Sequence, residues 1–150
     1  MNNICFVCTG NACRSPFAES VLTRLLADVE IDDCKVWSCG TLNWGVNPRD
    51  EIMVEIARKM GYVMGGTTTF MTSEVLNEAD RIIVFESRHR DAITRVLDYG
   101  HWDRIILFDS IAFGQNTEVM DPHYQSMRIY EDVAKHIEDG CMEILKKCAR

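Results

Sequence analysis

Residues 4–16 read ICFVCTGNACRSP, and this stretch decides the fold around which the rest of the chain is organised. Residues 4–8 form a short continuous apolar run, the pattern of a central strand that is buried on both faces. A turn follows directly, where Gly10 lets the backbone change direction. From there the sequence favours a helix, with Ser15 as its N-cap and Pro16 at the first helical position. The stretch therefore predicts a strand, a loop and a helix in immediate succession.

The same alternation of strand and helix repeats along the rest of the chain. We expect three more strands and three more helices, the second helix ending at Gly61. The strands are expected at residues 34–38, 81–85 and 104–108, and the helices at residues 49–60, from Ser87, and over residues 130–145. Such an order implies a parallel sheet with helices on both faces, a three-layer α/β sandwich. Ligands bind beyond the carboxyl ends of the strands in such sheets, where the loops at residues 8–15 and 109–122 can meet.

The composition is that of one globular domain, which we place at residues 1–150. The chain has 150 residues, of which 47% are hydrophobic and 26% charged, enough to bury a full core. Its formal net charge of -7 argues against nucleic acid or an anionic membrane as a partner, because these require a basic face. No apolar run approaches the roughly 20 residues of a membrane span, and the first ten residues lack the pattern of a signal peptide. We expect a soluble, cytoplasmic protein.

The cysteines and histidines do not form a disulfide framework or a metal site. Seven cysteines is an odd number, and their spacing is irregular, as expected for free thiols in a reducing compartment. Several, such as Cys5 and Cys148, lie among apolar residues, where a thiol behaves as a small hydrophobic group. The four histidines are scattered without metal-ligand spacing. We predict no metal and no cofactor.

The loop at residues 8–15 has the composition of a phosphate cradle. A cysteine and an arginine separated by five residues are weak evidence alone, but here the cysteine ends a buried strand and the arginine precedes a helix. Loop amides and the helix N-terminus can point at one centre, and the forked guanidinium of Arg14 can hold two phosphate oxygens. The same groups favour the thiolate form of Cys8. The sequence thus predicts metal-free phosphate chemistry with Cys8 as the nucleophile.

Residues 7–16 resemble the signature of the low-molecular-weight protein tyrosine phosphatases. Residues 38–41, SCGT, followed by Trp44 resemble the second segment of that family, and Asp121-Pro122 resembles its general-acid loop. The three motifs occur in the family's order, and nearly the whole chain fits in length. The resemblance implies a single phosphatase domain with a four-stranded parallel sheet in the order 2-1-3-4. It also implies a phosphotyrosine-containing protein as substrate, and a chain that is monomeric or weakly self-associating.

The resemblance also implies a role for each matching residue. Cys8 would attack phosphorus to form a phosphocysteine, Arg14 would hold the phosphate oxygens, and Asp121 would protonate the departing phenolate and later deprotonate water. Ser15 would hydrogen-bond the thiolate. Asn11 would adopt a left-handed conformation and would be held by a contact with Ser38. The other substrate-binding residues of the loop would be Thr9, Gly10, Ala12 and Cys13.

Two of these residues have a second interpretation. An Asp-Pro pair such as Asp121-Pro122 is also a common turn former. Cys13 either forms a reversible disulfide with Cys8, which would protect the nucleophile from over-oxidation, or fills space behind the loop.

Aromatic residues are the candidates for the walls of the substrate cleft. Trp44 and Tyr124 are predicted to bind substrate there, although either could be a core residue. Animal members of the family commonly have two aromatics after Asp-Pro, whereas this chain has His123 and Tyr124. The composition of the wall, and with it the substrate preference, therefore stays open.

Three other functions fit the sequence less well. An arsenate reductase with this loop needs downstream cysteines, and none lies between Cys39 and Cys141. A phosphocysteine carrier must keep its phosphate, so Arg14 and Asp121 would be liabilities. A phosphotyrosine-binding module without activity would be expected to lack the nucleophile or the acid.

Overall fold

The computed structural model describes residues 2–148, which build a four-stranded parallel sheet in the order β2-β1-β3-β4. Residues 1, 149 and 150 of the predicted domain lie outside the described residues. The strands are β1 (Asn3–Cys8), β2 (Lys35–Gly40), β3 (Arg81–Val84) and β4 (Ile105–Leu107). β1 pairs with β2 on one side and with β3 on the other. The parallel sheet and its predicted strand order are confirmed.

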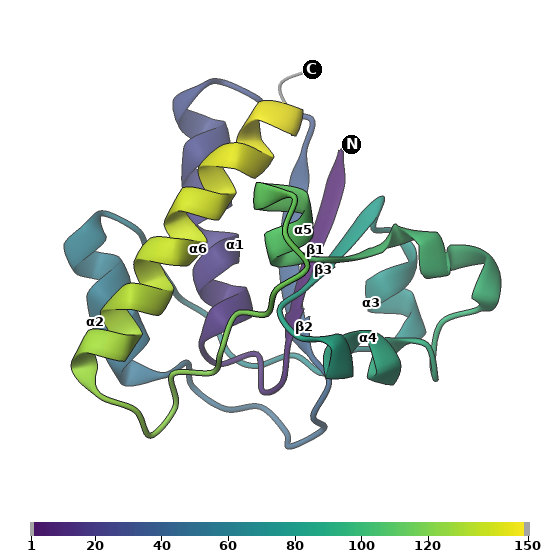
Figure 1. The fold of residues 1–150 in the computed structure, drawn as a ribbon, viewed down its shortest axis with the longest axis horizontal. Coiled ribbons are helices and arrows are strands. Elements are labelled where there is room, and N and C mark those ends of the chain that lie inside the picture. Colours follow the sequence, from purple (N-terminus) through teal and green to yellow (C-terminus); the bar gives the residue numbers. More distant parts are fainter. Residues whose placement is uncertain (1, 149–150) are drawn as a thin grey trace.

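Helices cover both faces of the sheet, as Figure 1 shows. One face carries α1 (Arg14–Asp28), α2 (Glu51–Met60), α5 (Phe108–Phe113) and α6 (Met127–Cys148). The other face carries α3 (Ser73–Asn77) and α4 (Ser87–Ile93), with the 3-10 helix η1 (Tyr99–Arg104) leading from α4 into β4. The predicted three-layer sandwich is confirmed.

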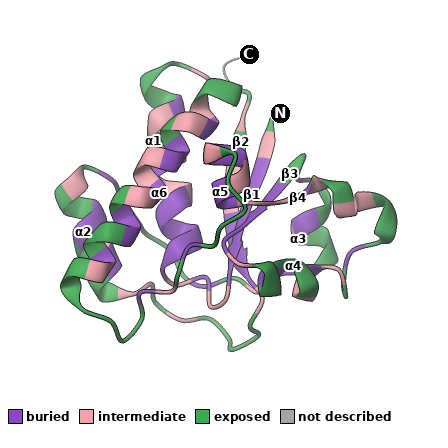
Figure 2. Ribbon diagram, in the orientation of Figure 1, coloured by how far each residue is buried: buried purple, intermediate pink, exposed green. Residues whose placement is uncertain are grey.

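The central strand β1 divides the core into two parts. Ile4, Phe6 and Cys8 face α1 and α6, whereas Cys5 and Val7 face the side of α3 and α4, and all five are at most 2% exposed. Figure 2 shows the buried residues concentrated in the sheet and on the helix faces against it. Because β1 is packed on both sides, the loop at its carboxyl end starts from a rigid support.

The N-caps of two helices differ from the prediction. Cys13, not Ser15, is the N-cap residue of α1, and no side chain caps that helix. The Ser15 hydroxyl is instead bonded to the sulfur of Cys8, so a local capping preference is overridden by a contact across the loop. Glu86, not Ser87, is the N-cap of α4.

Several element boundaries also differ from the prediction. The second strand runs two residues further, to Gly40, and the fourth ends at Leu107 because Phe108 begins α5. α3 and α5 were not predicted; with 5 and 6 residues, they are too short to show a helical period. α2 begins after Asp50, whose carboxylate accepts hydrogen bonds from the backbone N–H groups of the first turn. The predicted C-cap, Gly61, is confirmed.

The last helix, α6, is the longest, with 22 residues. It is amphipathic and packs against α1, α2 and α5, and its seven buried residues are Tyr130, Val133, Ala134, Ile137, Gly140, Cys141 and Ile144. Across residues 2–148, no helix reaches the length and hydrophobicity needed to cross a bilayer.

Candidate active site

The loop between β1 and α1 lies at the carboxyl edge of the sheet and packs backbone to backbone on β2. Cys8 is the last residue of β1 and Arg14 the first of α1, with 2% and 1% exposure. Gly40 lies opposite Cys8 in the sheet. A Cβ atom at Gly40 would lie 2.6 Å from the carbonyl oxygen of Thr9 and 2.8 Å from the backbone nitrogen of Asn11. The absence of a side chain at Gly40 therefore allows the loop to approach this closely.

Two donors from Ser15 converge on the sulfur of Cys8. The Ser15 hydroxyl lies 2.9 Å from Cys8 Sγ, and the Ser15 backbone N–H donates to the same sulfur at 3.4 Å. Asn11 Nδ2 donates to the Ser15 hydroxyl oxygen at 2.9 Å. Because an amide nitrogen can only donate, the Ser15 oxygen accepts there, and its own hydrogen can be donated to the sulfur or to the Cys39 carbonyl oxygen at 3.4 Å, of which the sulfur is the nearer. The arrangement stabilises negative charge on Cys8.

Asn11 is the polar centre of the loop. It is buried, has a φ of 55°, and its Nδ2 also donates to Ser38 Oγ at 2.9 Å, so the expected left-handed conformation and tie to Ser38 are confirmed. Asn11 Oδ1 accepts from the Thr69 backbone N–H at 2.8 Å and from Arg49 NH1 at 2.7 Å. Both ends of the amide are thus fully bonded, which fixes its orientation.

Arg14 is held along one edge of its guanidinium. Its NH1 donates to Glu86 Oε2 at 2.6 Å and to the Val119 carbonyl oxygen at 2.7 Å. Burial raises the pKa of Glu86, but hydrogen bonds from Arg88 and Arg14 outweigh it and hold that pKa below its ordinary value. Glu86 is therefore a carboxylate that fixes NH1. Within residues 2–148, neither Nε nor NH2 of Arg14 donates a hydrogen bond to the protein, so this edge of the guanidinium remains available to an anion.

Asp121 reaches the same edge of the sheet from the loop that follows α5. Its Oδ2 lies 3.8 Å from Arg14 NH2, and its Oδ1 accepts from the His123 backbone N–H at 3.0 Å. Its side chain is 40% exposed, so it lies at the mouth of the loop rather than beneath it. Val119 fixes the loop, since its N–H donates to the Phe85 carbonyl oxygen at 2.9 Å. The structure thus brings Asp121 to the Arg14 guanidinium.

The two predicted wall residues are on the surface, so the interpretation of either as a core residue is wrong. Trp44 is 45% exposed, and its indole Nε1 donates to the Gly10 carbonyl oxygen at 3.0 Å, which places the ring against the loop. Tyr124 is 92% exposed, and its ring centroid lies 3.9 Å from that of His123. Their contact with a substrate stays a prediction.

Cys13 lies behind the loop and is 8% exposed. Burial, with further contributions that include the charge of Asp50, raises the pKa of its thiol well above the ordinary value. Cys8 and Cys13 are both free thiols here. Cys13 is accordingly a weak nucleophile in this state, and its part in a disulfide stays a prediction.

Four site residues were missed by the sequence analysis. Arg49, Glu86 and His89 bond to residues 9–14 directly, and Glu19 accepts from Ser38, which in turn accepts from Asn11. Glu86 lies two residues after the end of β3 at the carboxyl edge of the sheet, so the argument that placed Asp121 there could have found it. The others carry no local signal. Within residues 2–148, no three side chains of His, Cys, Asp or Glu gather closely enough to hold a metal ion.

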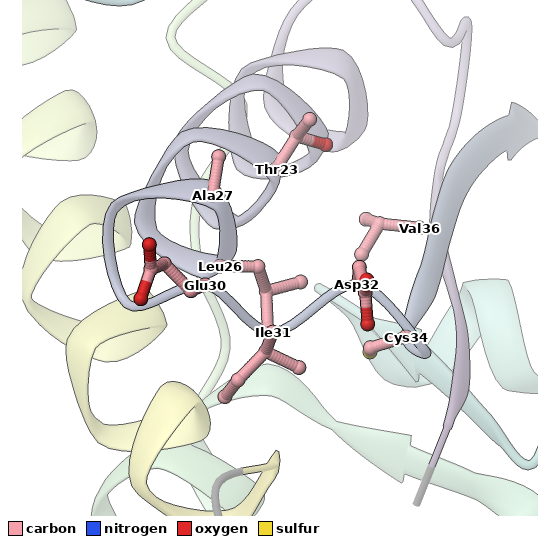
Figure 3. Close-up of a pocket in the computed structure, with 8 residues that line it drawn as sticks. All are labelled: Thr23, Leu26, Ala27, Glu30, Ile31, Asp32, Cys34 and Val36. Atoms are coloured by element: carbon pink, nitrogen blue, oxygen red, sulfur yellow. The ribbon is translucent and has the colours of Figure 1, made fainter.

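A separate pocket of 370 Å³ lies between α1 and the start of β2 (Figure 3). Leu26, Ile31, Val36 and Cys34 are among the residues that line it, and no predicted site residue does. It lies at the amino end of β2, whereas the loop at residues 8–14 lies at the carboxyl end of β1, to which β2 runs parallel. The pocket is therefore not part of the candidate site.

Fold and site together define an α/β protein in which a cysteine and an arginine flank the loop at the carboxyl end of the central strand. The family model described as low molecular weight phosphotyrosine protein phosphatase matches residues 3–150. The chain belongs to this family of hydrolase enzymes, which confirms the resemblance seen in the sequence.

Relatives and solved structures cover the chain from end to end. The low molecular weight protein-tyrosine-phosphatase YfkJ of Bacillus subtilis is 30% identical over 149 residues, covering 97% of this chain and 94% of its own. A low molecular weight phosphotyrosine phosphatase from Vibrio cholerae O395 has a TM-score of 0.92, with 27% identity and coverage of 100% and 98%. The arginine phosphatase YwlE, as a cysteine-to-serine variant with a phosphorylated active-site serine, has a TM-score of 0.88, with 25% identity and coverage of 99% and 96%.

Proposed function

We propose that this chain hydrolyses phosphotyrosine in proteins through a phosphocysteine at Cys8, with Asp121 as the general acid. The observation that carries the proposal is the joint placement of three groups. The sulfur of Cys8 lies 2.9 Å from the Ser15 hydroxyl, Arg14 opens the helix that follows, and Asp121 lies 3.8 Å from Arg14. A nucleophile, an anion clamp and a proton donor are the groups that such a reaction requires.

In the first step the Cys8 thiolate attacks phosphorus. The S–P bond forms as the bond between phosphorus and the tyrosyl oxygen breaks, and the proton of the Asp121 carboxyl group passes to the departing phenolate. The conjugate acid of that leaving group has a pKa near 10, so a placed acid typically accelerates its departure by 10² to 10⁴-fold. The loop amides and the free edge of Arg14 hold the three remaining oxygens.

In the second step the Asp121 carboxylate takes a proton from water, whose oxygen attacks phosphorus. The S–P bond breaks, Cys8 returns as the thiolate, and inorganic phosphate leaves. The donors of Ser15 stabilise the thiolate both as nucleophile and as leaving group. The YwlE variant, whose active-site serine is phosphorylated, supports a covalent step at this position.

Arginine phosphatase activity is the second candidate. It is favoured by the similarity to YwlE, which covers nearly the whole length of each of the two chains. Arsenate reduction has less support, because the downstream cysteines both lie on α6. Cys141 is fully buried, which raises the pKa of its thiol, and Cys148 lies at the far end of the helix, away from the loop (Figure 1).

The test compares initial rates on peptides with phosphotyrosine, phosphoserine or phosphoarginine, together with arsenate reduction, for the wild type and for Cys8→Ser. We expect phosphotyrosine to be hydrolysed fastest and Cys8→Ser to show no turnover. Faster hydrolysis of phosphoarginine would replace the proposed substrate with the second candidate. Turnover by Cys8→Ser would refute the mechanism for either substrate.

A further inference from the structure

His89 connects α4 to the loop between β1 and α1. α4 and α1 lie on opposite faces of the sheet. His89 lies in the first turn of α4 and is 1% exposed. Its Nε2 lies 2.9 Å from Oγ1 of Thr9, the residue directly after Cys8. Its Nδ1 accepts a hydrogen bond from the Glu86 backbone N–H at 3.1 Å. Both ring nitrogens are therefore in use.

These two contacts fix where the proton of the imidazole lies. The backbone N–H of Glu86 can only donate, so Nδ1 must present its lone pair. The neutral ring then carries its hydrogen on Nε2 and donates it to Thr9 Oγ1. Burial, together with the charge of Arg14, lowers the pKa of His89 to about 3, so the ring is neutral at the pH of a cell.

This tautomer determines what the Thr9 hydroxyl can do. Its oxygen accepts from His89, so its own hydrogen cannot be donated back to that ring. Within residues 2–148, His89 is the protein group to which the hydroxyl is bonded. The Thr9 carbonyl oxygen accepts from the Leu42 N–H at 2.9 Å, which holds the backbone in place. The half-buried hydroxyl thus keeps one unused donor in the loop.

We propose that His89 is a positioning residue for the phosphatase reaction, orienting Thr9 so that its hydroxyl donates to the phosphoryl group bound in the loop. The inference rests on the proposed function, since it adds a donor to that same site. The first turn of α4 then fixes both ends of the loop. His89 holds Thr9, next to the nucleophile, and Glu86 holds Arg14.

A double-mutant cycle on kcat/KM for an aryl phosphate tests the connection. Thr9→Val removes the hydroxyl at nearly constant shape. His89→Asn keeps an acceptor at the position of Nδ1 but withdraws the donor from Thr9, whereas His89→Gln keeps a donor at the position of Nε2. We expect Thr9→Val and His89→Asn each to lower kcat/KM about tenfold, as for one hydrogen bond to a charged group. The double variant should be no slower than the slower single variant, and His89→Gln should recover most of the loss.

Losses that multiply in the double variant would show that His89 does not act through Thr9, and wild-type kcat/KM in Thr9→Val would show that the hydroxyl is unused. Urea unfolding of each variant separates a folding defect from a site defect. Long-range proton–nitrogen NMR of the wild type tests the tautomer without activity, and a hydrogen on Nδ1 or a charged ring at pH 7 would overturn the proposal. A wild type with this tautomer that binds inorganic phosphate but hydrolyses no phosphate ester would refute the proposed function instead.

Discussion

At the scale of single residues, Asn11 acts on the sulfur of Cys8 through Ser15. Asn11 donates to the Ser15 hydroxyl oxygen, which lies 2.9 Å from that sulfur. The Asn11 amide is fixed by four hydrogen bonds, and its donation to the Ser15 oxygen directs the Ser15 hydrogen to the sulfur of Cys8 or to the more distant Cys39 carbonyl oxygen. A donor that is already oriented costs no reorganisation when charge appears on the sulfur. The proposed reactivity of Cys8 therefore depends on Asn11 as well as on the Ser15 hydroxyl beside the sulfur.

Ser15→Ala removes the hydroxyl donor and should lower kcat about tenfold, because one hydrogen bond to a charged group is lost. The alkylation rate of Cys8 by iodoacetate at pH 6 should fall in parallel, since a hydrogen-bond donor to the sulfur is removed. The matched control is Ser20→Ala, on the same helix, whose hydroxyl donates to the Phe17 carbonyl oxygen at 2.7 Å, away from the sulfur of Cys8. Equal alkylation rates in wild type and Ser15→Ala would count against a role of Ser15 at the thiolate.

Asp121→Asn tests the proton donor. An asparagine keeps the acceptor for the His123 N–H, so the loop conformation should persist while the acidic proton is lost. We expect kcat to fall by about 10² to 10⁴-fold for phosphotyrosine and much less for aryl phosphates with acidic phenols, which leave without protonation. A uniform loss across leaving groups, measured by steady-state kinetics, would assign Asp121 a structural role.

At the scale of elements, the close approach of the loop to β2 depends on Gly40. A Cβ atom there would meet the backbone of Thr9 and Asn11, neither of which can rotate away as a side chain could. Gly40→Ala should therefore displace the loop and lower kcat/KM by about 100-fold or more, in line with the cost of misplacing a reacting group. Gly100→Ala is the control, because no atom of the described residues outside its chain neighbours lies within 4 Å of a Cβ atom at Gly100. Wild-type kinetics in Gly40→Ala would show that the loop tolerates the shift.

Most elements could be predicted because their signals are local. The apolar run of β1 and the C-cap Gly61 mark boundaries within a few residues of themselves. α5 escaped prediction because Phe108 continues the apolar run of β4, and a run of that length fits either element. The succession of strand, loop and helix around residues 8–15 was predictable from those residues.

The anchors of the loop could not be predicted in the same way. Glu86 and His89 meet Arg14 and Thr9 across 72 and 80 residues of sequence. The place of Glu86 after a strand could have indicated its contact, but no period or spacing in the sequence indicates that His89 meets Thr9. Sequence analysis therefore found the groups proposed to react and missed those that hold them.

At the scale of the whole molecule, buried His89 makes stability depend on pH. Its pKa is lowered to about 3 in the folded chain, from an ordinary value of 6.5. Between these values the unfolded chain binds a proton that the folded chain does not, so the free energy of unfolding decreases as the pH falls from 6.5 towards 3. Above pH 6.5 neither state binds this proton, and the free energy of unfolding is not lowered by it. Below pH 6.5 the free energy of unfolding decreases with falling pH, and the slope approaches about 1.4 kcal/mol per pH unit.

His89→Gln removes that proton-binding site, so its free energy of unfolding should fall less steeply with decreasing pH than that of the wild type. Urea unfolding at pH 7.0, 5.5 and 4.5 measures the two slopes. Thr9→Val is the control. It removes the partner of His89 but leaves the ring buried, which is the larger cause of the shift, so its slope should match the wild type. Equal slopes in His89→Gln and wild type would contradict the assignment.

The central step of the proposed reaction is transfer of the phosphoryl group to Cys8. It is tested most directly by mixing the protein with excess phosphotyrosine peptide, stopping the reaction by denaturation during the first turnovers, and analysing the digested chain by mass spectrometry. We predict one phosphoryl group on the peptide that contains Cys8, formed at least as fast as phosphate is released, and none in Cys8→Ala. Steady hydrolysis of phosphotyrosine with Cys8 unmodified throughout would contradict the mechanism.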